Sequence, residues 1–194
     1  MSVLELAQQD QLWTLDGLLW SLEEGQRLAY MASRVPRHLA IIEIGSHKGK
    51  STCFLAAGSR AGNGARVYAV DLWDLADFIK PSVLEDFRAQ VNGAGLEHLI
   101  TPVRGDSLEV AARWKHRAGL LFIDGCHEYE AVRADYRAWG HLVEPGGYVA
   151  FHDYHEQFPG VVRVVDEIVR PSEMWGRFCL HGESLVSLMR DQPR

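Results

Sequence analysis

The sequence predicts an α/β domain in which a parallel sheet carries helices on both faces. Short apolar runs alternate with helix-length segments from Leu39 to Val169. The runs are continuously apolar, which is typical of strands that are buried on both faces. Several runs close on an acidic residue, as Asp71 and Asp124 do. We therefore expect right-handed crossovers and a ligand site at the carboxyl ends of the strands.

Length and composition limit the class of protein. The 194 residues suffice for one domain with a substantial core, which we expect over residues 1–194. Residues 1–35 would form a lead-in and a capping helix, and residues 36–194 a Rossmann-like core. The net charge of -6 argues against a nucleic-acid partner. The chain shows neither a membrane-length apolar stretch nor a signal-peptide pattern, so we expect a cytoplasmic protein without a membrane partner.

The first predicted helix begins after Ser21. Ser21 and Glu24 have the spacing of a capping box, and Pro36 stops the helix. Its buried face is predicted at Leu22, Leu28 and Met31.

The alternating part of the chain predicts five strands, then a hairpin. The strands are Leu39–Ile44, Arg66–Asp71, Leu99–Gly105, Gly119–Asp124 and Tyr148–Asp153, and the hairpin is Arg177–Arg190. The helices between them are Lys50–Ala61, Pro81–Gly95, Asp106–Arg117, Tyr129–Val143 and Gly160–Val169. Pro81 suits the first turn of its helix, and Pro145-Gly146-Gly147 would end the fourth of these helices.

Three successive strand ends predict an adenosine-containing cofactor. Gly45 and Gly49 bracket a tight turn before a helix, where the backbone can approach a ligand. Taken alone, this pair is equally typical of an ordinary strand-to-helix turn. Asp71 ends the second strand and could accept hydrogen bonds from both ribose hydroxyls. Asp106 follows the third strand, where it could meet the adenine amino group.

Two observations favour S-adenosylmethionine over a nicotinamide dinucleotide. The Gly-x-Gly-x-x-Gly fingerprint is absent. Glu43 makes the end of the first strand acidic, which would repel a pyrophosphate and attract a sulfonium and an amino group. A nicotinamide-dependent oxidoreductase remains the alternative from another class.

Taken together, several segments resemble the class I S-adenosylmethionine-dependent methyltransferases, and more narrowly the macrocin-type sugar O-methyltransferases. They are "IIEIGSHKGKST", "VYAVDLW", "GDS", "LFIDGCHEYEAVRADYRAW" and "PGGYVAFHDY". The resemblance covers roughly Ser21 to Val169 and implies a seven-stranded sheet with an antiparallel C-terminal hairpin. It also implies cofactor contacts at Glu43, Gly45, Ser46, Gly49, Ser51, Asp71, Trp73, Asp106, Ser107 and Asp124. Trp73 would lie near the adenine or, alternatively, pack on the domain.

His127 is the candidate general base, three residues past the end of the fourth strand. Related catechol-type methyltransferases carry a lysine base at this distance from a metal-binding aspartate, and the macrocin-type resemblance implies a histidine. The alternative is that His127 caps the following helix or bonds a backbone group.

The candidate metal ligands are Asp124, His152 and Asp153. Catechol-type enzymes use an aspartate after the fourth strand and an Asp-Asn pair after the fifth, whereas this chain has His-Asp. The identity of the metal is therefore open: oxygen ligands suit Mg²⁺, and an imidazole favours Mn²⁺, Fe²⁺ or Zn²⁺. Alternatively the site holds no metal, and these groups bond each other and the substrate.

The resulting prediction is a divalent-metal-assisted O-methyltransferase that acts on a hydroxyl of a small molecule or glycan sugar. A metal-independent enzyme with His127 alone as base, or a non-catalytic S-adenosylmethionine-binding protein, are the alternatives. A homodimer is possible. The acceptor pocket would be shaped by the N-terminal lead-in, the Leu72–Lys80 loop and the loop after Asp153, none of which shows a recognisable chemistry.

Overall fold

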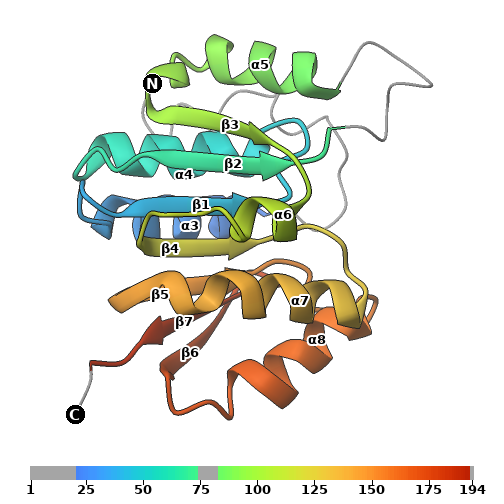
Figure 1. The fold of residues 1–194 in the computed structure, drawn as a ribbon. Helices are drawn as coiled ribbons and strands as arrows, with labels where there is room; N and C mark the ends of the chain where they lie inside the picture. The colour runs from blue at the N-terminus through green and yellow to red at the C-terminus, as the bar shows by residue number, and fades with distance from the viewer. Residues whose placement is uncertain (1–20, 74–82, 193–194) are drawn as a thin grey trace.

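The structure is a computed structural model that describes residues 21–73 and 83–192 (Figure 1). The first twenty residues of the predicted lead-in, Pro81 and most of the Leu72–Lys80 loop lie outside the described residues. Within the described ranges, no helix has the length and apolar character needed to cross a membrane. The prediction of a single domain over the whole chain stays a prediction.

The predicted sheet is confirmed, with seven strands in the order β3-β2-β1-β4-β5-β7-β6. The strands are β1 Ala40–Ile44, β2 Val67–Asp71, β3 Ile100–Arg104, β4 Ala118–Ile123, β5 Val143–Phe151, β6 Trp175–His181 and β7 Leu185–Arg190. β7 runs antiparallel to both of its neighbours, and β1–β5 pair in parallel. The strand order reverses between β1 and β4, which is where sheets of this kind bind ligands.

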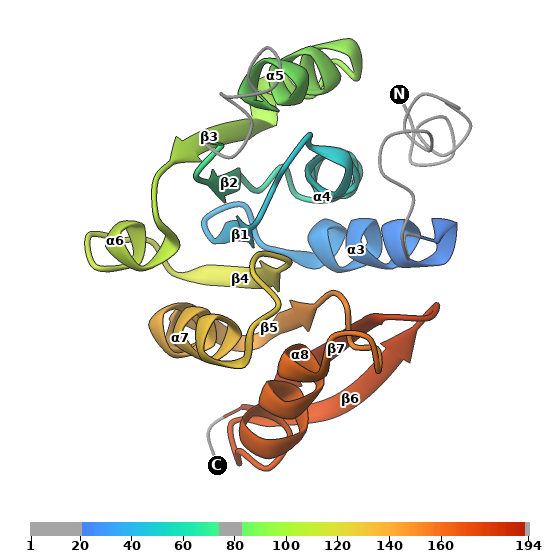
Figure 2. The ribbon, with the colours of Figure 1, turned by 90° about the vertical axis from the view of Figure 1, so that its right-hand side faces the viewer.

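Helices cover both faces of the sheet, as Figure 2 shows from the carboxyl ends of the parallel strands. α3 (Leu22–Arg34), α4 (Lys50–Ala61) and α5 (Val83–Gly93) pack on one face, and α6 (Ser107–Ala111), α7 (Tyr129–Trp139) and α8 (Pro159–Val164) lie on the other. Neighbouring residues of β1 belong to opposite cores, because Ile41 packs with α3 and α4 and Ile42 packs with α7 and α8. This two-sided burial explains why β1 is apolar at almost every position.

The capping box at the start of α3 is confirmed. The Glu24 backbone N–H donates to Ser21 Oγ, and the Ser21 backbone N–H donates to a Glu24 carboxylate oxygen. Leu28 and Met31 are fully buried as predicted, but Leu22 is 38% exposed and does not belong to the buried face. Leu22 is the first residue of the helix.

Two predicted boundaries were wrong for identifiable reasons. α7 ends at Trp139 and a 3₁₀ turn, Gly140–Leu142, leads directly into β5, so Pro145-Gly146-Gly147 lies inside the strand. The pairing of β4 with β5 shifts register there, which a proline without an N–H imposes on a ladder. The helix predicted over Asp106–Arg117 is only Ser107–Ala111. All three cysteines, Cys53, Cys126 and Cys179, are free thiols.

Candidate active site

The turn between β1 and α4 requires glycine at its first position. Gly45 has a φ of 85°, and a Cβ there would lie 2.2 Å from the carbonyl oxygen of Asp124. The end of β1 can therefore pass the end of β4 only because residue 45 lacks a side chain. Gly49 also has a positive φ, 86°, and begins α4 without a side-chain cap. The predicted tight turn is confirmed, and it adjoins the backbone of Asp124.

Asp71, at the end of β2, holds this turn in place. Its Oδ2 accepts hydrogen bonds of 2.8 Å from the backbone N–H groups of Ser46 and His47. Its Oδ1 accepts one from the backbone N–H of Trp73, at 2.7 Å. A carboxylate oxygen can accept two hydrogen bonds, so Oδ1 keeps capacity for a further donor. The ribose contact of Asp71 stays a prediction, and the structure adds a role in shaping the turn.

Glu43 is fully buried on the face of β1 that packs against α4. Its Oε2 accepts hydrogen bonds from the hydroxyls of Ser46, at 2.7 Å, and Thr52. Its Oε1 has no hydrogen-bond partner within the described part of the chain. Burial raises the pKa of Glu43 to about 7, against the nearby hydroxyls of Ser51, Thr52 and Ser46, which lower it. The predicted cofactor contact is untested, and Thr52 is a partner that the sequence pattern did not reveal.

The segment that follows β3 contacts a buried carboxylate of α7, that of Asp135. Asp106 caps α6 by accepting hydrogen bonds from the backbone N–H groups of Leu108, at 2.9 Å, and Glu109, at 3.1 Å. Ser107 donates its hydroxyl proton to Asp135, which is 6% exposed. The adenine contact of Asp106 and the cofactor contact of Ser107 stay predictions. Sequence reasoning missed Asp135, although its spacing from the core residue Val132 could have indicated burial.

Trp73 packs on the domain, which was one of its two predicted environments. It is 3% exposed, and its indole N–H donates to the carbonyl oxygen of His47 at 2.8 Å. Its ring centroid lies 5.0 Å from that of Phe87 in α5. Contact with an adenine stays a prediction.

The three predicted metal ligands come together at the ends of β4 and β5. One donor atom from each of Asp124, His152 and Asp153 lies within 4.8 Å of the others. His152 Nδ1 is 3.3 Å from Asp124 Oδ1 and 3.2 Å from Asp153 Oδ1. Parallel pairing of the two strands brings the residues together, because the backbone N–H of His152 bonds the carbonyl oxygen of Ile123. Two carboxylates and an imidazole are a suitable donor set for a divalent cation.

His127 lies beside this cluster. Its Nε2 is 2.8 Å from Asp153 Oδ2, and its side chain is 40% exposed. Its ring packs against Phe158, with the two centroids 4.5 Å apart. The cap of α7 is Glu128, so the helix-capping alternative for His127 is not what the structure shows. The hydrogen bond to Asp153 raises the pKa of His127, although burial opposes that shift.

Charges in the cluster stabilise one another. Burial alone would lower the pKa of His152, but the nearby carboxylates, Asp124 foremost, outweigh it and raise the pKa to about 12. Burial would raise the pKa of Asp153, but hydrogen bonds from both histidines hold it well below its usual range. Burial raises the pKa of Asp124 despite its contact with His152. The cluster therefore combines an exposed histidine with a buried ionic group.

Two further residues approach His152 from the opposite side, and sequence reasoning gave them no place in the site. Glu24 is fully buried and accepts hydrogen bonds from the backbone N–H groups of Ser184 and Leu185. Ser184 Oγ lies 3.3 Å from His152 Nε2. The capping-box pattern identified one partner of Glu24, and no local pattern could identify partners 160 residues away along the chain.

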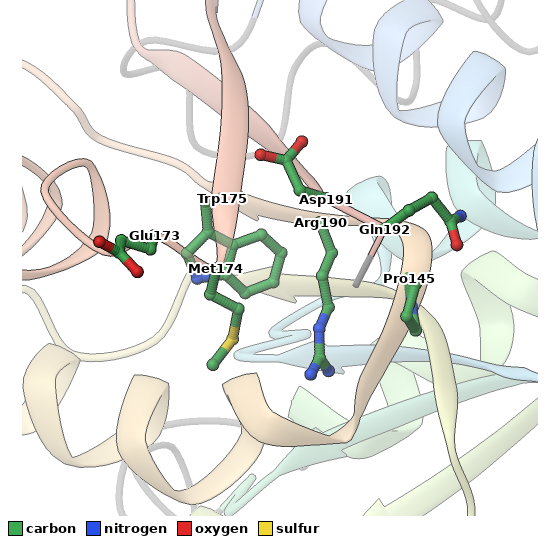
Figure 3. A pocket seen from close by; sticks show the side chains of 7 residues that line it. All are labelled: Pro145, Glu173, Met174, Trp175, Arg190, Asp191 and Gln192. Carbon is green, nitrogen blue, oxygen red and sulfur yellow. The ribbon is translucent and has the colours of Figure 1, made fainter. Parts of the chain in front are cut away.

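A hollow of about 610 Å³ lies elsewhere on the molecule (Figure 3). It is lined by Pro145, Glu173, Met174, Trp175, Arg190, Asp191 and Gln192. These residues lie at the start of β5 and β6 and the end of β7. The hollow is therefore at the amino ends of the parallel strands, whereas the candidate site is at their carboxyl ends. The hollow includes none of the predicted site residues.

Comparison with known proteins gives a family match and several similar structures. The family described as "Methyltransferase domain" matches residues 42–154, more than half of the chain. An uncharacterized protein of Acanthamoeba polyphaga mimivirus is 23% identical over 134 residues, which span 68% of this chain and 59% of that protein. The chain thus spans less than two thirds of the length of this relative.

Two solved structures share the fold at low sequence identity. The O-methyltransferase TomG from Streptomyces achromogenes, in complex with S-adenosylmethionine, has a TM-score of 0.69 and 18% identity, covering 98% of this chain and 89% of its own. An O-methyltransferase from Bacillus cereus, in complex with S-adenosylhomocysteine, has a TM-score of 0.70 and 18% identity, covering 97% of this chain and 90% of its own.

Proposed function

Because the chain belongs to the methyltransferase-domain family, we propose that it transfers the methyl group of S-adenosylmethionine to a hydroxyl oxygen. The observation that carries this proposal is the position of the His127–Asp153 pair. It lies at the edge of the sheet where Gly45 brings the predicted donor turn against the backbone of Asp124. The proposed proton acceptor, His127, and the turn proposed to bind the cofactor would thus adjoin each other.

The predicted cofactor fits the three strand ends. The Gly45–Gly49 turn presents backbone groups at the start of α4, and Asp71 and Asp106 follow at the ends of the next two strands. Similar structures contain S-adenosylmethionine and S-adenosylhomocysteine, which supports the same cofactor here. Glu43 would contribute an acidic environment beneath the turn, favourable to a sulfonium and unfavourable to a pyrophosphate.

His127 would remove the proton from the acceptor hydroxyl. The sulfonium is a good leaving group, so the protein must align the acceptor oxygen and accept its proton. If Nε2–H of His127 donates to Asp153, the lone pair of the neutral ring is on Nδ1. Nδ1 is then the atom that accepts the proton, and Asp153 orients the ring and stabilises the imidazolium that forms.

Asp124, His152 and Asp153 would hold a divalent cation. When bound, such a cation would lower the pKa of the acceptor hydroxyl and fix its position. Asp153 can serve both partners, because its Oδ1 faces His152 and its Oδ2 faces His127. Mg²⁺ suits the carboxylates, and Mn²⁺ or Zn²⁺ suits the imidazole.

A metal-independent enzyme is the second candidate, and one observation favours it. His152 Nδ1 lies within 3.3 Å of both carboxylates, so an imidazolium there would neutralise charges that a cation would otherwise neutralise. His127 would then act without an ion beside it.

The acceptor is proposed to be a small hydroxylated molecule or a glycan sugar. The net charge of -6 disfavours binding to a nucleic-acid backbone. The fold itself does not distinguish acceptors, since one fold supports many functions.

Methyl transfer from labelled S-adenosylmethionine to a panel of sugars and phenols tests the proposal. S-adenosylhomocysteine should raise the melting temperature, since a ligand of the native state stabilises it, and NAD should not. Chelation should abolish transfer and leave S-adenosylhomocysteine binding intact. Full activity after metal removal would favour the metal-independent candidate, and a thermal shift with NAD alone would overturn the cofactor assignment.

A further inference from the structure

We infer that Glu24 and Ser184 are positioning residues that fix the tautomer of His152, with the proton on Nε2 and Nδ1 presented as a metal ligand. The inference rests on the proposed metal-assisted function. It extends the site to α3 and to the turn between β6 and β7, which lie outside the family match.

Glu24 acts only as a hydrogen-bond acceptor. Its Oε2 accepts from the backbone N–H of Ser21 at 2.7 Å. Its Oε1 accepts from the backbone N–H groups of Ser184, at 2.9 Å, and Leu185, at 3.0 Å. Backbone N–H groups cannot accept, so these contacts establish the direction of each hydrogen bond. The side chain is fully buried, and water does not compete with these donors.

The hydroxyl of Ser184 lies between Glu24 and His152 and bonds both side chains. Ser184 Oγ is 3.0 Å from Glu24 Oε1 and 3.3 Å from His152 Nε2. A hydroxyl has one proton, and Ser184 donates it to Glu24 Oε1. Ser184 therefore presents a lone pair to His152, and Nε2 of that ring must carry a hydrogen. The tautomer follows from the directions of these bonds.

The other nitrogen of His152 faces the carboxylates. Nδ1 lies 3.3 Å from Asp124 Oδ1 and 3.2 Å from Asp153 Oδ1. Once Nε2 holds the hydrogen, Nδ1 is the ring atom that can bind a cation together with these oxygens, and the proton that Nδ1 shares with the carboxylates in the metal-free imidazolium is released when the cation binds. Metal-binding histidines commonly donate their second N–H to a fixed acceptor, which orients the ring and the tautomer. The ring is 3% exposed, so it is held by protein groups rather than by water.

The decisive experiment follows the imidazole nitrogens by ¹⁵N NMR in the full chain, with Zn²⁺ as a diamagnetic probe. In the wild type, Zn²⁺ should shift Nδ1 of His152 and leave Nε2 protonated. Ser184→Ala should weaken Zn²⁺ binding about 10–100-fold, the usual loss for such a supporting group, and should mix the tautomers. Ser184→Thr retains the hydroxyl and should restore both properties. Glu24→Gln should also weaken binding, because its amide can donate towards Ser184.

Ser187→Ala is the matched control. Ser187 is a buried serine of β7, 3% exposed, and its hydroxyl bonds His181 Nε2 rather than His152. Its loss should leave Zn²⁺ affinity and the His152 signals unchanged. If Ser184→Ala fails to fold, the wild-type spectrum with Zn²⁺ still decides the tautomer.

Three results would overturn the inference: Zn²⁺ shifting Nε2 instead of Nδ1, no Zn²⁺ uptake, or a Ser184→Ala variant with unchanged affinity and spectrum. Methyl transfer by the chelated enzyme would leave the proposed methyltransferase activity standing in each case. Conversely, the expected spectrum in a protein that transfers no methyl group would contradict the proposed function and support the inferred tautomer of His152.

Discussion

The two halves of the candidate site use acidic residues in different ways. At the ends of β1–β3, Asp71 and Asp106 accept hydrogen bonds mainly from backbone N–H groups. At the ends of β4 and β5, Asp124 and Asp153 face the side chains of His127 and His152. The ends of β1–β3, the proposed methyl-donor half of the site, thus use negative charge to shape loops. The ends of β4 and β5, the proposed methyl-acceptor half, concentrate charged side chains in one place.

This contrast indicates where the chemistry resides. A carboxylate that accepts hydrogen bonds from backbone N–H groups fixes the shape of a binding surface, and the fold depends on its negative charge. A carboxylate that bonds a half-exposed histidine can stabilise the imidazolium that forms when that histidine accepts a proton. We expect substitutions in the donor half to reduce binding and stability together. Those in the acceptor half should reduce turnover while leaving cofactor binding intact.

The largest expected effect is that of His127→Ala. Loss of a general base lowers kcat by about 10²–10⁴-fold. Cofactor affinity, measured by calorimetry with S-adenosylhomocysteine, should stay within about twofold. Wild-type activity should rise with pH as His127 becomes neutral. In the metal-free protein the pKa of His127, measured by NMR, should lie above the usual histidine range, because the hydrogen bond to Asp153 raises it. A near-normal kcat across the pH range in the variant would show that another group is the base.

Asp71→Ala should show the opposite pattern, with binding and stability lost together. Three backbone N–H groups would lose a charged acceptor, and we expect a loss of about 3–4 kcal/mol in unfolding free energy, given about 1.5–3 kcal/mol for each such bond and incomplete additivity. Denaturant titration and S-adenosylhomocysteine calorimetry measure both effects. Asp71→Asn, which keeps one oxygen, should lose less. Unchanged stability with lost binding would assign Asp71 to the ribose alone.

Glu43→Gln should change how stability depends on pH. Burial raises the pKa of Glu43 to about 7, from the ordinary glutamate value of 4.5. Between these values the folded state binds a proton that the unfolded state has lost, so unfolding free energy falls as pH rises through this window. The shift corresponds to roughly 3 kcal/mol. Denaturant melts from pH 4 to pH 8 should lose this slope in Glu43→Gln, and an unaltered slope would contradict the buried proton.

The smallest expected effect is that of Trp73→Phe. The substitution removes one hydrogen bond to the His47 carbonyl and part of the contact with Phe87, for a loss of about 1–2 kcal/mol. S-adenosylhomocysteine affinity separates the two predicted environments of Trp73. If Trp73 only packs, affinity should fall no more than stability requires. A larger loss, specific to adenine-containing ligands, would place the indole beside the base.

The sequence was most informative where the pattern is local. The capping box, the continuously apolar strands and the order of polar strand ends predicted the sheet and placed Asp124, His152 and Asp153 at one edge, where the structure brings them together. Parallel pairing makes such an inference possible, since strand ends that alternate with helices meet at one edge.

The parts that could not be predicted depend on contacts between distant segments. Glu24 meets Ser184 across 160 residues, and Ser107 meets Asp135 across 28. The packing of Trp73 depends on the position of Phe87, which no local spacing encodes. The end of α7 was misplaced because Pro145 and the glycines beside it, which commonly break helices, here mark a strand irregularity.

The contact between Glu24 and the turn that joins β6 to β7 has a consequence for synthesis on the ribosome. α3 is synthesised early, but the partners of its buried carboxylate lie between β6 and β7 and are synthesised after the other five strands. Until then Glu24 lacks the backbone donors of Ser184 and Leu185, and Nε2 of His152 lacks the Ser184 hydroxyl. A nascent chain therefore cannot complete the proposed metal-ligating geometry before the turn between β6 and β7 has been synthesised.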